Sequence, residues 1–149
     1  MSAITVFEKE FVERTKQILL EHDGKEEYDV TFLLNCLLGL TVLPIEKRKK
    51  DSKLEKICNE KLKELNVIDF TDKDEKKLYH SFKNAISHMH IEIVNKENKI
   101  SEIIFRDKNP PNNSNFHTEL KFTYSQLKEF AIFIADSYLE LGEFTGYGK

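Results

Sequence analysis

The sequence has no long apolar run, few cysteines and few glycines, and each shortage excludes a class of protein. The longest apolar stretch, Val30–Pro44, is interrupted by Asn35 and Gly39. It is shorter than the roughly 20 residues of a membrane span and predicts a buried helix. The two cysteines, Cys36 and Cys58, fit no zinc motif, and their places in predicted helices favour free core thiols. The five scattered glycines form no phosphate-binding loop.

The composition of the chain predicts an ordinary soluble protein without membrane association, and the two free thiols favour the cytoplasm. At 149 residues we expect one domain over residues 1–149, with an ordered core at about 6–141. The N-terminal residues 1–4 have no signal-peptide pattern. A net charge of −3 provides no overall attraction to nucleic acid, so any such contact must come from a local patch.

Hydrophobic periodicity predicts a mainly α fold. Five helices are expected, at about 6–22, 30–40, 52–65, 71–88 and 123–142, with two short strands at 91–94 and 99–105. Residues 95–98 have turn chemistry, so the strands should form a hairpin. We expect Thr71 to cap the fourth helix and Thr123 with Gln126 to form a capping box at the fifth. The second helix is apolar nearly all round, which is typical of a central helix or an oligomer interface.

The segment from Leu78 to His90 is the most informative part of the chain. At about 100° per residue, its apolar side chains share one arc: Leu78, Phe82, Ala85, Ile86 and Met89. The opposite arc is polar: His80, Lys83, Asn84, Ser87, His88 and His90. This arc contains no carboxylate, so it suits a phosphate better than a metal ion.

Spacing on the polar arc relates three of these residues. Asn84 lies four residues after His80 and four before His88, so its amide is placed to orient an imidazole. Lys83 and His88 are about 140° apart around the helix axis, so one helix does not easily bring both to one phosphate. Two copies side by side do, and we therefore expect a homodimer. The alternative is a merely solvated face, with His80 and His90 in solvent.

Several segments of this chain together resemble the HEPN superfamily, in particular its plasmid-encoded bacterial subfamily. They are Phe11–Thr15, Tyr28–Pro44, Phe82–Ile91 and Ile103–Asp107. The resemblance implies a dimerising bundle of four to five helices with a short β-hairpin after the motif helix. Many members are metal-independent endoribonucleases in toxin–antitoxin, phage-defence and RNA-processing systems.

The family motif is an arginine, usually followed by a polar residue, with a histidine four to six residues after the arginine. Here His88 matches the histidine and Asn84 the polar position, whereas Lys83 replaces the arginine. Arginine grips two phosphate oxygens with a planar fork, and lysine offers only a point charge. The resemblance implies catalytic roles for Lys83, Asn84 and His88.

In those roles, His88 would move the proton, since the unperturbed histidine pKa of about 6.5 suits neutral pH. Lys83 would stabilise the phosphorane, and Asn84 would orient His88. We expect His80, Ser87 and His90 to contact substrate, with no metal and no cofactor.

Three hypotheses remain open from the sequence. The first is a dimeric HEPN ribonuclease. The second is a non-catalytic HEPN dimer that binds RNA, a nucleotide or a protein partner such as an antitoxin, and Lys83 favours it. The third is a structural helical dimer with a solvated polar face, and an exposed motif face lined by carboxylates would favour it.

Overall fold

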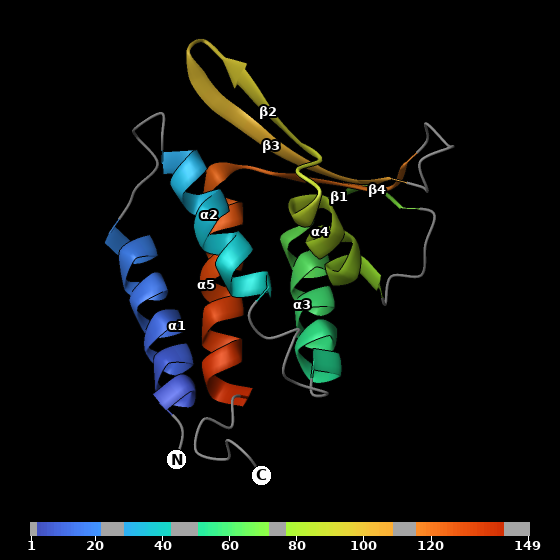
Figure 1. Ribbon diagram of the computed structural model, residues 1–149. Helices are drawn as coiled ribbons and strands as arrows, with labels where there is room; N and C mark the ends of the chain where they lie inside the picture. The colour runs from blue at the N-terminus through green and yellow to red at the C-terminus, as the bar shows by residue number, and fades with distance from the viewer. Residues whose placement is uncertain (1–2, 22–28, 43–50, 72–76, 109–115, 142–149) are drawn as a thin grey trace. The chain divides into compact units, whose positions relative to one another are not determined.

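The computed structural model describes residues 3–21, 29–42, 51–71, 77–108 and 116–141. In chain order these form α1 (Ala3–Glu21), α2 (Asp29–Val42), α3 (Asp51–Leu65), β1 (Ile68–Thr71), α4 (Leu78–Ser87), β2 (Ile91–Lys96), β3 (Lys99–Lys108), β4 (Phe116–Phe122) and α5 (Tyr124–Leu141) (Figure 1). The chain divides into two compact units, Met1–Leu54 with Ala131–Lys149, and Glu55–Phe130. That both form one domain stays a prediction.

The first unit is helical in its described part. α1 contacts α2, and Gly39 permits the close approach because a Cβ there would lie 2.9 Å from the ring of Phe11. An ion pair of 2.6 Å between Lys16 Nζ and Asp136 Oδ1 joins α1 to the C-terminal part of α5. α2 buries residues at helical spacing: Val30, Leu33, Leu37 and Leu40. Asn35 and Leu38 on its other side are exposed, so this apolar helix is only partly covered.

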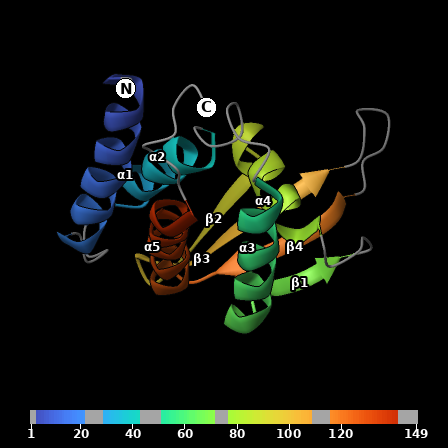
Figure 2. The ribbon, with the colours of Figure 1, turned by 90° about the horizontal axis from the view of Figure 1, so that it is seen from below.

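The second unit contains an antiparallel four-stranded sheet in the order β1-β4-β3-β2. α4 packs on one face of the sheet, against β3 and β4, and α3 lies on the same side (Figures 1 and 2). Lys96 pairs with Lys99, and a two-residue turn of Glu97 and Asn98 connects β2 to β3. Both turn residues have positive φ, 52° and 65°, as a type I′ hairpin turn requires. The predicted hairpin is confirmed.

The core of the second unit is built around the ring of Phe82. Its centroid lies 4.7 Å from that of Phe105, 5.1 Å from Phe130 and 5.8 Å from Phe122. These rings come from α4, both central strands and α5, and all four are fully buried. Burial of this cluster holds α4 to the sheet.

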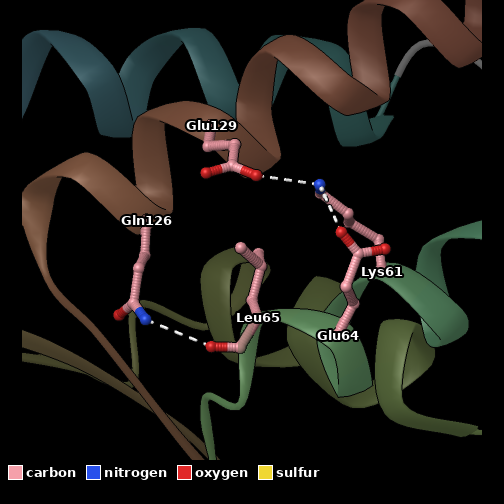
Figure 3. A network of polar contacts seen from close by, with 5 residues as sticks. All are labelled: Lys61, Glu64, Leu65, Gln126 and Glu129. Carbon is pink, nitrogen blue, oxygen red and sulfur yellow. Dashed lines mark hydrogen bonds and ion pairs between the residues drawn. The ribbon is translucent and has the colours of Figure 1, made fainter.

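Polar contacts connect α3 to the first turns of α5, within the second unit (Figure 3). Lys61 Nζ lies 2.8 Å from Glu129 and 3.3 Å from Glu64, and Gln126 donates to the Leu65 carbonyl at 3.1 Å. The hydrogen bond with Glu129 raises the pKa of Lys61. The predicted capping box is also confirmed: the Thr123 N–H donates to Gln126 at 2.9 Å, and the Gln126 N–H donates to Thr123 at 3.1 Å.

The mainly α prediction is confirmed, but the sheet is larger than the expected short hairpin, because β1 and β4 were not predicted. β1 has four residues, too few for a pattern, and it is defined by its pairing with β4. β4 did carry a period-two signal, since Thr118, Leu120 and Phe122 alternate with the charged Glu119 and Lys121. Thr118 and Phe122 contact α4.

The expected cap at Thr71 is wrong. Thr71 ends β1, and its hydroxyl lies 3.0 Å from that of Thr118 on β4. α4 begins only at Leu78, and the stretch between lies outside the described residues. Thr71 therefore takes part in the pairing of β1 with β4, which is distant in sequence, and not in capping a helix.

Candidate functional site

α4 carries the predicted site, and a residue of α3 fixes its first turn. Lys77 at the N-cap provides no side-chain cap. The buried side chain of Asn59 instead accepts a hydrogen bond of 2.7 Å from the Tyr79 N–H. One of the N–H groups that a helix start leaves without an intrahelical partner is thus satisfied from a neighbouring helix. The start of α4 is thereby joined to α3.

Lys83 does not lie on the exposed face where the sequence placed it. It is buried, with 9% of its surface exposed, and its Nζ lies 2.9 Å from Oε1 of Glu55 on α3. The same Nζ is 4.9 Å from the centroid of the Tyr79 ring. Tyr79 precedes Lys83 by one helical turn, so both lie on the side of α4 that faces α3. The predicted polar arc is therefore split.

Cys58 lies on α3 near this ion pair. Burial raises the pKa of its thiol far above the ordinary value; Lys83 lowers it and Glu55 raises it to smaller extents. Cys36 on α2 is partly buried, and burial raises the pKa of its thiol as well. Both cysteines are free, as predicted, and both favour the unreactive thiol form.

The other predicted site residues gather at the C-terminal end of α4, except His80. Ser87 and His88 are exposed, and Asn84 and His90 are half-buried. The His88 N–H donates to the Asn84 carbonyl at 3.0 Å, so a backbone bond joins these two motif positions. The rings of His88 and His90 are stacked, with centroids 5.8 Å apart and planes inclined by 26°. His80 is also exposed, but it lies about 12 Å from His88 toward the start of the helix, at 1.5 Å per residue.

α4 ends in a left-handed turn centred on Met89, whose φ is 57°. The Met89 N–H donates to Ile86 at 3.2 Å and the His90 N–H to Ala85 at 2.9 Å. These two bonds define a Schellman motif, in which glycine usually occupies the left-handed position. The sequence placed Met89 on the buried apolar arc, and this prediction is wrong: 68% of the surface of Met89 is exposed.

The sequence did not predict that Glu55 and Asn59 belong to this region, and it placed Met89 on the wrong face. Glu55 and Asn59 belong to another helix, and no local pattern relates them to α4. Met89 was misplaced because the helical period was continued beyond Ser87, where the helix ends.

Charged side chains also connect neighbouring strands of the sheet. Arg106 on β3 lies 2.6 Å from Glu119 on β4 and 2.7 Å from Glu92 on β2. A hydrogen bond with Glu119 lowers the pKa of Asp69 on β1, and the ammonium of Lys121 contributes in the same direction. These contacts reinforce the order of the strands.

No group of three or more His, Cys, Asp or Glu side chains among the described residues is arranged to hold a metal ion. None of the helices in the described ranges is long and apolar enough to cross a membrane.

Comparison with protein-family models places most of the chain in a family. Residues 1–143 match the family described as HEPN pEK499 p136. No curated protein and no solved structure matches the chain.

Proposed function

The chain belongs to the HEPN pEK499 p136 family, and from this membership we propose that it binds RNA at the C-terminal end of α4 without cleaving it. The observation that carries the proposal is the ion pair between Lys83 and Glu55. Lys83 occupies the position of the arginine in the family's ribonuclease motif. Its ammonium is paired with this carboxylate, while His80 and His88 are exposed.

Cleavage by this motif requires a positive group beside the phosphate while the 2′-hydroxyl attacks it. Lys83 is poorly placed for that role, because its side chain is only 11% exposed and its Nζ contacts Glu55 at 2.9 Å. A phosphate that approached Nζ would also approach the Glu55 carboxylate and be repelled by it. Lysine moreover lacks the fork that holds two phosphate oxygens. Both features favour binding over catalysis.

A second candidate is a metal-independent endoribonuclease of a toxin–antitoxin or phage-defence system. The exposure of His88 favours it, because a general base or acid must reach the 2′-hydroxyl or the leaving oxygen. In this alternative, His88 moves the proton, Asn84 orients its ring and Lys83 leaves Glu55 when RNA binds.

Incubation of the full chain with mixed RNA in EDTA separates the two candidates. We expect the RNA to be bound, as fluorescence anisotropy reports, and to remain intact on a denaturing gel. His88→Ala should weaken binding. Cleavage by the wild type that leaves 2′,3′-cyclic phosphate ends and disappears in His88→Ala would instead establish the ribonuclease.

Variants of the ion pair test the observation itself. Lys83→Arg alone should remain inactive, because Glu55 can pair with a guanidinium as well as with an ammonium. Combined with Glu55→Gln, which removes the competing charge, Lys83→Arg should gain weak cleavage. If Lys83→Arg alone cleaves RNA as fast as the double variant, Glu55 is not what prevents catalysis.

Homodimerisation is part of this proposal, because HEPN proteins commonly dimerise. The exposed side of α2 supports it, since Leu38 is apolar there and Asn35 carries an amide that can donate and accept across a two-fold axis. Sedimentation at micromolar concentration should give a dimer, and Leu38→Lys should shift it toward monomer. A wild-type monomer would contradict this part. Any antitoxin or other protein partner remains a further proposal.

A further inference from the structure

We propose that His88, Met89 and His90 form a platform on which an unpaired RNA base stacks. The inference rests on the proposed function and specifies which part of the RNA this end of α4 recognises. It also assigns a role to Met89, which the motif does not include.

The backbone at Met89 provides the first observation. A φ of 57° is unfavourable for a residue with a Cβ, and glycine or asparagine usually occupies this position of a Schellman motif. The thioether is 68% exposed, so packing in the fold does not require a methionine. Backbone strain at a residue that packing does not explain is typical of functional sites.

The two imidazoles provide the second observation. The left-handed turn reverses the chain, so that the rings of His88 and His90 stack at 5.8 Å on either side of Met89 in the sequence. Unpaired bases stack on aromatic side chains, histidine included, and a thioether makes favourable contacts with ring systems. The imidazole pair and the exposed thioether of the residue between them in the sequence are thus side chains of the kind that bind the face of a base.

The end of the helix favours a base over a phosphate. The last turn of α4 contains no lysine or arginine, and the C-terminus of a helix carries a partial negative charge. That charge repels a phosphate and attracts the amino groups of a base. In duplex RNA the base faces are covered by their neighbours, so the ligand is single-stranded.

The experiment compares the full-length wild type with Met89→Gly and His90→Ala, using labelled single-stranded A-rich RNA in EDTA. Glycine accepts a positive φ, so Met89→Gly removes the platform side chain and the backbone strain together. We expect its thermal midpoint to rise while its affinity falls about two- to tenfold, as the loss of a contact between a thioether and a ring predicts. The loss should be equal at low and high salt, because no phosphate contact is removed. His90→Ala should also weaken binding.

Glu97→Gly is the matched control. Glu97 is exposed and has a φ of 52° in the β2–β3 turn, so this change relieves the same kind of strain away from the platform. We expect a raised thermal midpoint and unchanged affinity. A-rich RNA should bind more tightly than U-rich RNA, because a purine offers the larger stacking face, and duplex RNA should bind least.

Three results would overturn the platform. If Met89→Gly binds RNA with wild-type affinity, the platform is wrong, while the proposed function is unaffected. A lower thermal midpoint for Met89→Gly would show that the side chain packs in the fold. If the wild type binds none of the RNA probes, the proposed function fails together with the platform.

Discussion

The two ends of α4 differ in what surrounds their polar residues. Toward its start, the Tyr79 N–H and the Lys83 ammonium are bonded to Asn59 and Glu55 of α3. At its end, His88 is exposed and His90 is half-buried, and their rings stack on each other. Polar residues of one short helix thus serve two purposes, attachment of the helix at one end and availability for a ligand at the other. Position in the sequence motif alone does not distinguish them.

The largest effect should come from breaking the attached end at Phe82. Phe82→Ala removes the ring that contacts Phe105, Phe122 and Phe130, and we expect a loss of about 3–5 kcal/mol in the free energy of unfolding. Urea denaturation measures it. As the control, His80→Ala, at an exposed position of the same helix, should change stability by less than about 0.5 kcal/mol. Equal losses of unfolding free energy for both variants would contradict the inference that the Phe82 ring attaches α4 to the sheet.

The next effect should come from the ion pair. Glu55→Ala leaves the Lys83 ammonium buried without its carboxylate, and we expect a loss of about 1–3 kcal/mol in unfolding free energy. The value is below that of a fully buried pair, because 31% of the Glu55 side chain is exposed and solvent screens the charges. Breaking the exposed Glu10–Arg14 pair of α1 by Glu10→Ala should have no measurable effect, and a similar loss there would argue against burial as the cause.

The opposite behaviour is expected at the free end. His88→Ala should weaken binding of single-stranded RNA about three- to tenfold, while its unfolding free energy stays within about 0.5 kcal/mol of the wild type. Lys83→Ala should lower stability and leave the RNA affinity of the folded protein unchanged. Anisotropy titrations combined with urea curves measure both. If Lys83→Ala weakens binding and reduces its salt dependence, Lys83 contacts the phosphates after all.

The smallest effect should come from Asp69, away from both ends of α4. Asp69 forms an ion pair with Lys121 at 3.5 Å and its pKa is lowered, so its carboxylate stabilises the folded state above the unfolded pKa of about 3.9. This contribution is lost as pH falls through the lower, folded value. Asp69→Asn should therefore cost about 0.2–0.5 kcal/mol at pH 7, as exposed pairs do. The unfolding free energies of the wild type and Asp69→Asn should converge as the pH falls. A difference that grows in acid would mean that folding raises the pKa of Asp69.

The sequence predicted those parts of the fold that depend on neighbours in the chain. The five helices, the hairpin at Glu97 and the capping box of Thr123 with Gln126 are local, so periodicity and turn chemistry were sufficient. β1 depends on β4, 47 residues away at the contact of Thr71 with Thr118, and no local pattern encodes that pairing.

The same distinction applies to the candidate site. The exposure of Ser87 and His88 was predicted correctly, because it follows from the amphipathic pattern. The burial of Lys83 was not, because its partner Glu55 precedes it by 28 residues on another helix. Whether these positions bind RNA is a matter for the experiments above.

The hydrogen bond from Tyr79 to Asn59 has a consequence for folding. With 10 residues, α4 is shorter than the roughly 12–15 residues that an isolated helix needs to be even marginally stable in water. Its first turn is completed by a side chain 20 residues earlier in the chain. The helix therefore depends on α3 to be in place, and the hydrogen exchange of the Tyr79 amide reports how often the two separate. Exchange faster at Tyr79 than at Phe82 would mean that α4 first unravels at its attachment to α3.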